Sequence, residues 1–579
     1  MGDFIKDSIF IQALLAFSPI LVSAILLVGL RWSAKKTMPI IYLLVALIAL
    51  FAWQVPVERV FASTLQGLIY TASILWIVFG AILLLNTLKN SGAIKAIREG
   101  FINVSPDRRI QVIIIAWLFG CFIEGASGFG TPAAICAPLL VGLGFPAMAA
   151  ITIGMMIQST PVSFGAVGTP VLIGVKGGLD HQTIGQQLAE NGSSWDIFLQ
   201  TIISEVAITH AIVGTFIPLF MCVMMTRFFG KNKSWKEGLE ILPFAILSGL
   251  AFTIPYALTG VYLGAEFPSI IGALVGLPIV ILAAKNNFLT PKKQWDFPES
   301  SLWPAEWLGN LQEKVDTLTD DIKASKMSLT KAWLPYLLVA VLLVLSRIPE
   351  LGIGSILKYI NINFKNILNQ EGINGSFSPL YLPGGIMVLV VILTYFIHGM
   401  KPKQLSSAIG ESTKTLISAG FVLVFTVPMV RILINSGVND LNIASMPIAM
   451  AEFVADNVGK VYPIFAPTIG AMGAFIAGSN TVSNMMLSQF QFSTAMSLGV
   501  SGAILVALQA VGAAAGNMIA IHNIVAASAT VGLLGKEGDI LRKTIIPTLY
   551  YVIFAGAIGV IMIYLLGITD PLVVVPAVK

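Results

Sequence analysis

The chain has 579 residues, of which 56% are hydrophobic and only 11% are charged. A soluble domain carries about 25% charged residues, so this composition excludes an ordinary soluble protein and indicates a chain that crosses a membrane many times. The net charge of +5 includes no dense basic face, which argues against nucleic-acid binding. The three cysteines all lie in apolar segments, so we expect no disulfide framework, no metal site and no cofactor.

Apolar runs long enough to cross about 30 Å of hydrocarbon predict twelve spans in an all-α fold. They lie near residues 11–30, 38–57, 66–89, 146–175, 204–228, 238–260, 262–284, 332–348, 380–398, 412–434, 494–532 and 544–567. The first run lacks the basic flank of a signal peptide, so we expect it to be retained. Two further apolar regions, 109–143 and 460–492, break near their middles at glycines and small polar residues. We interpret both as re-entrant hairpins, each of which returns to its own side.

The loop charges predict an orientation. Basic residues cluster at 31–36, 89–109, 227–236, 285–331, 401–403 and 536–543. With twelve crossings and two hairpins, all these clusters fall on one side, which the positive-inside rule makes cytoplasmic. Both termini are then predicted outside. Counting the hairpins as full spans would instead scatter the positive loops over both faces.

Three sequence landmarks recur at nearly one offset. LKNSGA and LINSGV place Asn90 and Asn435 345 residues apart, GCFIEG and GAFIAG are separated by 353 residues, and Gln158 and Gln509 by 351. The predicted topology inverts the second copy. Inverted repeats with broken spans at matching positions are typical of secondary transporters, whose substrate site lies near the midplane where the breaks meet. Close helix packing explains isolated glycines such as Gly249, but it does not explain matched clusters.

The repeat sets the expected organisation of the chain. We expect scaffold helices over 1–64, the first repeat over 65–230 with the hairpin 109–143, linking helices over 231–284, a cytoplasmic loop over 285–331, further scaffold helices over 332–400, the second repeat over 401–567 with the hairpin 460–492, and a tail over 568–579. We expect no separate catalytic domain in the loop. A homodimer in the bilayer is compatible with this organisation.

The broken segments suggest a substrate class. A helix over 109–123 would be roughly 22 Å long and would stop inside the membrane. Thr131 is suited to cap the next helix, and Pro132 to start it, as are Thr169 and Pro170 after the next break. Unpaired backbone at membrane depth must face protein or a wet cavity. Helix N-termini placed there offer free N–H groups and partial positive charge, which suit a small carboxylate.

The candidate substrate ligands are the polar and backbone groups at these breaks, together with one cation, Arg431, whose side chain could instead extend to the membrane surface. They are Ser127, Gly128, Thr131, Gln158, Ser159, Thr160, Ser479, Asn480, Thr481, Asn484, Gln509, Asn517 and Arg431.

Each repeat core holds one residue suited to carry a proton. Glu124 is the only charged residue between Arg109 and Lys176, and His522 stands in a stretch, 461–535, without Asp, Glu, Lys or Arg. Ionisable groups inside a membrane are costly and usually functional, so both are candidates for proton coupling. A protonated, hydrogen-bonded Glu124 and a structural His522 are the alternatives. For the remaining histidines and one more acid we expect interfacial roles: His181, His210, His398 and Glu205.

Three segments, FIEGASGFGTPAAICAPLL, QSTPVSFGAVGTP and GSNTVSNMM, together resemble the bacterial L-lactate and glycolate permease family, over essentially the whole chain. The resemblance implies proton symport of L-lactate, D-lactate and glycolate across the bacterial inner membrane. The SNT at 479–481 is also similar to the tips of sodium-coupled dicarboxylate transporters, which form sodium and carboxylate sites in a domain that moves like an elevator. Here the first tip reads EGASG instead, which favours Glu124 as a proton carrier.

Two other functions remain open from the residues. Sodium-coupled carboxylate symport is the main competitor. GASG at 125–128 also matches the GxSG nucleophile pattern of rhomboid-type intramembrane proteases, with His210 or His522 as the base. Four-residue matches are common in a chain with 53 glycines, and a protease needs no inverted repeat. We therefore predict a transporter and not an enzyme.

Overall fold

The computed structural model describes residues 5–26, 30, 32–102, 104–128, 130–308, 327–348 and 351–572. Nearly all regular structure in these ranges is helical. Two short strands, β1 (Ile362–Phe364) and β2 (Gly375–Phe377), form one antiparallel pair. Part of the predicted loop 285–331 and the end of the predicted tail lie outside the described residues.

The helices of the first part of the chain include both arms of the first predicted hairpin. They are α2 (Ile9–Ala24), α3 (Ala34–Leu47), α4 (Val57–Ser91), α5 (Ala93–Ile102), α6 (Arg108–Gln111), α7 (Gly120–Ser127), α8 (Thr131–Gly142), α9 (Ala147–Met156), α10 (Gly165–Thr169), α11 (His181–Glu190), α12 (Trp195–Gly214), α13 (Ile217–Phe229), α14 (Trp235–Leu239), α15 (Leu242–Tyr262) and α16 (Pro268–Lys285). A π-helical segment, Val112–Phe119, joins α6 to α7, so the first arm is one continuous helix.

The later helices include the second hairpin, formed by α23 and α24. They are α18 (Leu329–Arg347), α19 (Ile353–Leu357), α20 (Pro383–Ile397), α21 (Pro402–Asn435), α22 (Met446–Val458), α23 (Tyr462–Ala477), α24 (Asn480–Leu498), α25 (Gly502–Gly516), α26 (Ile521–Val531) and α27 (Glu537–Val560). Both predicted hairpins are therefore present as pairs of helices joined by a turn.

The described residues hold ten helices long and apolar enough to cross a membrane, or eleven when the bent α21 is counted as one span. Some predicted spans, such as those of α2 and α20, are occupied by shorter apolar helices. The chain is an all-helical, polytopic membrane protein. The predicted number of twelve spans is therefore approximate. The apolar helices differ in length, with 15 residues in α20 and 35 residues in α4, and the shortest fall below the length needed to cross a membrane.

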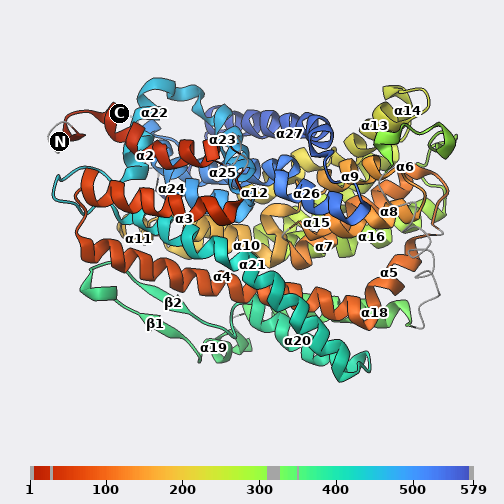
Figure 1. Ribbon diagram of the computed structural model, residues 1–579, viewed down its shortest axis with the longest axis horizontal. Helices are drawn as coiled ribbons and strands as arrows, with labels where there is room; N and C mark the ends of the chain where they lie inside the picture. Colours follow the sequence, from red (N-terminus) through yellow and green to blue (C-terminus); the bar gives the residue numbers. More distant parts are fainter. Residues whose placement is uncertain are drawn as a thin grey trace.

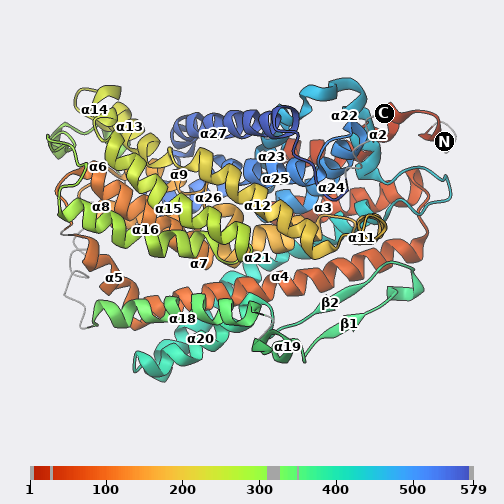
Figure 2. The ribbon, with the colours of Figure 1, turned by 180° about the vertical axis from the view of Figure 1, so that it is seen from behind.

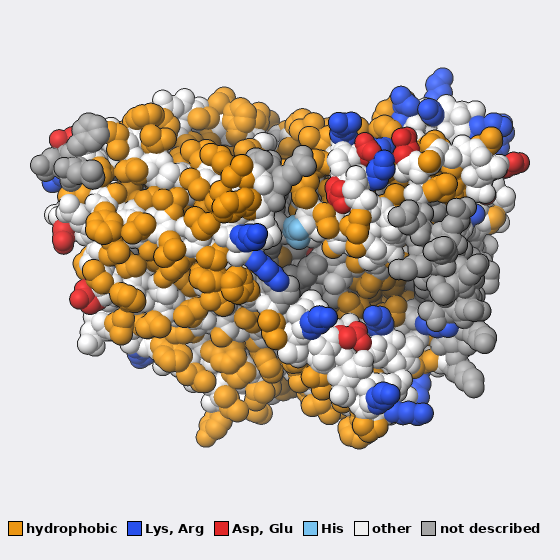
Figure 3. All heavy atoms as spheres, viewed as in Figure 1, with side chains coloured by type: hydrophobic (Ala, Val, Ile, Leu, Met, Phe, Trp, Pro, Cys, Tyr) orange, Lys and Arg blue, Asp and Glu red, His pale blue; other side chains and the backbone are white. Residues whose placement is uncertain are grey.

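The long helices run roughly parallel to the long axis of the molecule (Figure 1). The beginning of α2, the β1–β2 pair and α11 lie at one end, which we call the terminal end. The helices α5 and α14 lie at the other end, which we call the basic end; the view from behind shows the same division (Figure 2). On the face seen in Figure 3, hydrophobic side chains cover a broad area, and most Lys and Arg side chains lie towards the basic end.

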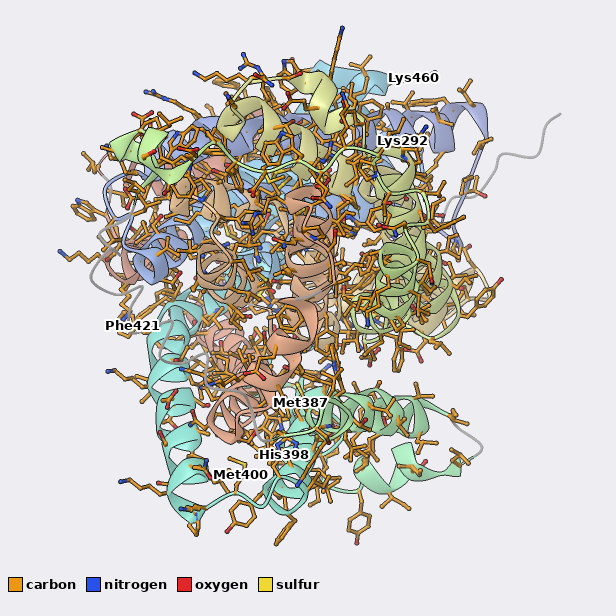
Figure 4. All side chains as sticks on the ribbon, turned by 90° about the vertical axis from the view of Figure 1, so that its right-hand side faces the viewer. Lys292, Met387, His398, Met400, Phe421 and Lys460 are labelled. Atoms are coloured by element: carbon orange, nitrogen blue, oxygen red, sulfur yellow. The ribbon has the colours of Figure 1, made fainter. Side chains whose placement is uncertain are left out.

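Figure 4 looks at the basic end, with His398 and Met400 at one edge of the molecule and Lys292 towards the opposite edge. His398 follows α20, and its two ring nitrogens lie 2.9 Å from the Ser91 hydroxyl and 2.9 Å from the Lys331 carbonyl. His398 is therefore partly exposed and held between α4 and the start of α18.

Close contacts between small residues hold the long helices together. A Cβ added to Gly67 in α4 would lie 2.3 Å from the Pro428 backbone of α21. A Cβ on Gly80 would lie 2.5 Å from the Gly384 carbonyl of α20. The same holds between α23 and α25, where Gly512 meets Pro467. In lipid, such close approach lets van der Waals packing drive helix association.

A buried ion pair anchors the base of the first hairpin. Arg109 is 0% exposed and donates to Asp107 at 2.8 Å. Its remaining N–H groups donate to the carbonyls of Glu237 and Lys293, and Asp107 also accepts from the Trp295 backbone. The part of the loop that follows α16 is therefore fastened to the hairpin.

Candidate functional site

The first hairpin turns at Gly128 and Gly130, between α7 and α8. Both have positive φ, 62° and 73°, which glycine adopts without steric cost. Gly130 occupies the cap position of α8, so the prediction that Thr131 is the cap is wrong. Thr131 is the first helical residue, and its hydroxyl donates to the Gly128 carbonyl at 2.7 Å. The Ser127 hydroxyl donates to the Ile123 carbonyl at 2.8 Å and also bonds with the Thr131 hydroxyl.

Glu124 lies one turn before this tip and is 2% exposed. One carboxyl oxygen, Oε2, accepts a hydrogen bond from Nε2 of Gln158 at 3.0 Å. The other oxygen, Oε1, faces Gly165, where an added Cβ would lie 2.5 Å away. The carboxyl group therefore sits between a side-chain amide and a backbone break, and glycine at 165 leaves room for it.

The span after the first hairpin is broken at residues 165–168. Ala166, Val167 and Gly168 have φ of 41°, 57° and 78°, and all three are buried. The left-handed region costs a non-glycine residue about 1–2 kcal/mol, so the surrounding structure must enforce this run. Gly128 packs directly on it, since an added Cβ would lie 2.9 Å from that of Ala166. The broken segment 165–168 and the first tip are therefore in direct contact.

The second hairpin turns at Gly478, which has a φ of 73°. Ser479 caps α24, and its side-chain oxygen accepts from the Val482 N–H at 3.4 Å. The Nδ2 group of Asn484 donates to Oδ1 of Asn480 at 2.7 Å and to the Pro170 carbonyl at 3.2 Å. The second tip therefore contacts the restart of the broken span in the first half of the chain.

The beginning of α26 lies against both tips. A Cβ on Gly478 would lie 2.5 Å from Nδ1 of His522, and a Cβ on Gly130 would lie 2.7 Å from Oδ1 of Asn523. Two hairpins separated by more than 300 residues therefore meet at one place, and His522, itself exposed, lies there. We call this place the tip junction.

Four buried carboxamides around the tip junction each keep one polar atom without a hydrogen-bond partner among the described residues. They are Oε1 of Gln158, Nδ2 of Asn480, Oδ1 of Asn484 and Oδ1 of Asn517. A buried polar atom left unsatisfied costs about 1–3 kcal/mol, so native structures normally pair such atoms. Together these residues leave one donor and three acceptors unpaired within the described part of the chain.

The other predicted ligands are engaged within the surrounding helices. The Ser159 hydroxyl bonds to a carbonyl of the preceding turn, and Thr160 accepts from a tyrosine of α27 at 3.0 Å. Both ends of the Gln509 amide bond to side chains of α24. The Thr481 backbone packs on Gly174, in the segment that follows the break. These residues position the tip junction rather than offer free polar atoms to it.

The expectation of an interfacial His210 is wrong. Its side chain is 0% exposed and bonds to the Ser163 hydroxyl at 2.8 Å and to the Tyr551 hydroxyl at 2.6 Å. Glu205, on the same helix, is also buried. The reason is that α12 begins at Trp195, nine residues before the predicted span, so both side chains lie well inside the helix. His181, at the start of α11, is partly exposed, as expected.

The GxSG pattern at 125–128 does not form a serine–histidine pair. The hydrogen bonds of the Ser127 hydroxyl go to Ile123 and Thr131, whereas His210 is paired with Ser163 and Tyr551, and His522 lies against Gly478.

Arg431 is not brought to the tip junction. It lines a cavity of about 950 Å³ at the terminal end, bounded by α4, α11, α21 and the β1–β2 pair. Its Nε donates to Gln66 at 3.0 Å, and its Nη1 donates to the Gly177 carbonyl at 2.6 Å. We call this the terminal-end cavity.

A second cavity, of about 580 Å³, lies towards the basic end between α4, α5 and α8. Asn86, Lys89, Asn90 and Lys95 line it, and so does Thr131 of the first tip. We call it the basic-end cavity. Thr131 therefore belongs both to the first tip and to the wall of this cavity.

Sequence reasoning missed Asn523, which faces the first tip from α26. Asn523 is uncharged, so it did not stand out in the apolar stretch as its neighbour His522 did. It also missed the chain of buried polar groups through Ser163, His210 and Tyr551. A prediction that placed His210 inside its helix, and not at the membrane surface, would have pointed to these buried polar groups.

The fold and the tip junction define a polytopic membrane transporter built around two helical hairpins. The family model of the L-lactate permeases matches residues 12–566. The chain belongs to this family.

Individual relatives match over most of their own length. A putative L-lactate permease of Haemophilus influenzae is 32% identical over 544 residues, covering 90% of this chain and 92% of the relative. The glycolate permease GlcA of Escherichia coli is 29% identical, covering 95% of both chains. An L-lactate permease of Escherichia coli is 28% identical, covering 96% of this chain and 97% of the relative.

Two solved transporter structures show a distant likeness. MtrF of Neisseria gonorrhoeae is 16% identical with a TM-score of 0.41, covering 84% of this chain and 80% of its own. YdaH of Alcanivorax borkumensis is 13% identical with a TM-score of 0.40, covering 86% of both chains.

Proposed function

We propose that the protein is a proton-coupled symporter of L-lactate and related 2-hydroxymonocarboxylates, namely D-lactate and glycolate, across the bacterial inner membrane. The observation that carries the proposal is the tip junction, where two hairpin tips meet with unpaired amide atoms and a buried carboxyl group beside them. The relatives named as L-lactate and glycolate permeases support the substrate class.

The chemistry of the junction suits a 2-hydroxy acid. Helices α8, α24 and α26 all begin here, and helix N-termini favour a carboxylate through free N–H groups and partial positive charge. The unpaired Nδ2 of Asn480 adds one more donor. The three unpaired amide oxygens, on Gln158, Asn484 and Asn517, can accept from the substrate hydroxyl. A substrate with a carboxylate and an adjacent hydroxyl can accept hydrogen bonds from the N–H donors and donate one to the amide oxygens.

Glu124 supports coupling to protons. Its carboxyl group is buried one turn from the first tip and bonds to Gln158, which also has an unpaired oxygen. A charged carboxylate beside an anionic substrate is repulsive, whereas a protonated Glu124 is not. Substrate and proton therefore favour each other's binding, as symport requires. His522, at the start of α26 and against the second tip, is the other residue able to exchange a proton here.

The repeat and the orientation complete the proposal. The two hairpins belong to inverted repeats over 65–230 and 401–567, which together form the moving part of an elevator-type transporter. The helices over 1–64, 231–284 and 332–400 form the scaffold and its links. The basic end is cytoplasmic, by the positive-inside rule, and both termini are outside.

Uptake into proteoliposomes tests the function and its coupling ion. We expect radiolabelled L-lactate to accumulate when a proton gradient, acid outside, is imposed without sodium, and glycolate to compete. Liposomes with a sodium gradient at equal pH should show no accumulation. Accumulation under the sodium gradient alone would contradict proton coupling, and uptake of neither acid under either gradient would contradict the substrate class.

A further inference from the structure

The terminal-end and basic-end cavities occupy corresponding positions in the two repeats. At the offset of 345 residues, Asn435 corresponds to Asn90 and Gly437 to Gly92. The first residue of each pair lines the terminal-end cavity, and the second lines the basic-end cavity. The repeated Asn-Ser-Gly sequence therefore contributes residues to the wall of a cavity at each end of the molecule.

Two positions in this correspondence differ in charge. Lys89 of the basic-end cavity is exposed, lies 3.6 Å from a Glu411 oxygen and corresponds to the apolar Ile434. The second difference is buried. Arg431, in the terminal-end cavity, corresponds to Asn86, in the basic-end cavity. Asn86 is satisfied by the Ser412 hydroxyl at 2.9 Å. The terminal-end wall therefore holds a fixed positive charge where the other wall holds a neutral amide.

Arg431 is buried without an ion pair. It is 3% exposed, and its hydrogen bonds go to the neutral oxygens of Gln66 and Gly177, with the Tyr70 ring 5.1 Å from its guanidinium. No carboxylate of the described residues lies within ion-pair distance of it. A buried cation is costly unless an anion compensates it, so this group is suited to an incoming anion.

A second guanidinium lines the same cavity. Arg59 is 8% exposed and donates to the carbonyls of Asn435 at 3.0 Å and Glu371 at 3.4 Å. The acid of the cavity wall, Asp180, accepts from the backbone N–H groups at the start of α11 and from a threonine hydroxyl there. Guanidinium groups bind carboxylates through paired N–H donors, which lysine cannot reproduce.

We propose that the terminal-end cavity is a second carboxylate-binding site, distinct from the tip junction, with Arg431 as its charged anchor. It captures the anion on the outer side before the anion reaches the tip junction. The corresponding basic-end cavity lacks this buried anchor. Its two lysines, Lys89 and Lys95, are not buried, and Lys89 already faces Glu411 at 3.6 Å, so the anion is released there more readily. The inference rests on the proposed function for the identity of the anion and for the orientation.

Transport measured separately from each face tests the second site. In right-side-out membrane vesicles, Arg431→Gln should raise the KM for L-lactate about 10-fold, a loss of about 1.4 kcal/mol of binding. In inside-out vesicles its KM should stay within about two-fold of wild type. Lys358→Gln is the matched control, because Lys358 is an exposed cation that does not line the cavity. It should change neither KM.

Two further variants keep the test decisive if Arg431→Gln does not fold. Arg59→Gln should also raise the outer KM and leave the inner one unchanged. Asn86→Arg adds the missing anchor to the basic-end cavity and should lower the inner KM several-fold. An equal rise at both faces, or no rise at the outer face, would overturn the second site while leaving lactate transport intact. Failure of wild-type vesicles to transport lactate would instead overturn the proposed function, and the second site with it.

Discussion

The two hairpin tips have the same outline but different chemistry. Each is a helix, a turn at a left-handed glycine and a second helix that starts inside the fold. The first tip has a buried carboxyl group, that of Glu124, next to a strained backbone break. The second has a serine cap and a pair of asparagines, and the stretch 461–535 around it has no acid, lysine or arginine.

The proposed proton symport must combine two tasks, anion binding and proton exchange, and this difference assigns one task to each tip. Amides and helix N-termini bind an anion at any working pH, because they do not titrate. A carboxyl group can bind and release a proton, and its charge then governs the anion beside it. We therefore expect changes at the first tip to act mainly on coupling, and changes at the second tip to act mainly on affinity for the substrate.

The largest effect is expected at Glu124. Glu124→Gln keeps the shape and the contact with Gln158 but removes the exchangeable proton. Accumulation driven by a pH gradient should fall at least 10-fold, and the pH dependence of uptake should flatten, whereas exchange of labelled for unlabelled lactate continues. Glu205→Gln, the same change at a buried acid of α12, is the control. Undiminished accumulation in Glu124→Gln would remove the distinction between the tips.

A smaller effect, on affinity, is expected at Asn480. Asn480→Ala removes the unpaired Nδ2 donor and the oxygen that binds Asn484. The KM for lactate should rise about 10-fold, since one hydrogen bond to a charged group is worth about 1.5–3 kcal/mol, with the stoichiometry of protons to lactate unchanged. Asn457→Ala, at an exposed position of α22, should leave KM unchanged. A changed stoichiometry would show that the second tip also takes part in coupling.

The contact between the first tip and α26 is expected to have an intermediate effect. Gly130→Ala forces an L residue into a φ of 73° and places a methyl group against Asn523. Uptake should fall about 3- to 10-fold, as about 1 kcal/mol of strain and one displaced side chain predict. Gly142→Ala, in the same helix α8 with no atom within 4 Å of the added Cβ, is the matched control. Equal uptake by both variants would show that the tip contact is dispensable.

The smallest effect is expected from the cap of the second tip. Ser479→Ala should lower the free energy of unfolding by about 1 kcal/mol, the usual cost of a lost N-cap, with at most a two-fold rise in KM. Denaturation in mixed micelles measures the first quantity. Ser328→Ala, which removes the cap of α18, is the control for cap loss away from the tips. A large rise in KM with unchanged stability would make Ser479 a substrate ligand instead.

Much of this arrangement could be predicted from the sequence, because hydrophobicity and helix breaks are local. The runs of apolar residues located the long helices, and Gly128, Gly130 and Gly478 marked both turns. The lone acid Glu124 was recognisable by its isolation in an apolar stretch. Ser479 was a competent cap in its own local sequence, and it is the cap observed.

The remaining features depend on contacts between distant segments, which local patterns do not encode. Thr131 looked like a cap, but it is the first helical residue, and the cap is Gly130, because the turn there needs a positive φ. Arg431 looked like a ligand of the central site, yet α21 places it in the terminal-end cavity. The position of Asn523 against the first tip depends on where α26 packs, and no residue pattern within that helix reveals it.

The left-handed run at Ala166 and Val167 has a consequence for how such a chain evolves. Glycine would occupy both positions without the steric cost that the two β-carbons impose, about 1–2 kcal/mol each. A chain selected for stability alone would therefore replace them. Their presence makes the break stiffer than glycine would, because it removes alternative backbone conformations from the unfolded and partly opened states. The break is thus less stable than it would be with glycine, but it has fewer backbone conformations open to it.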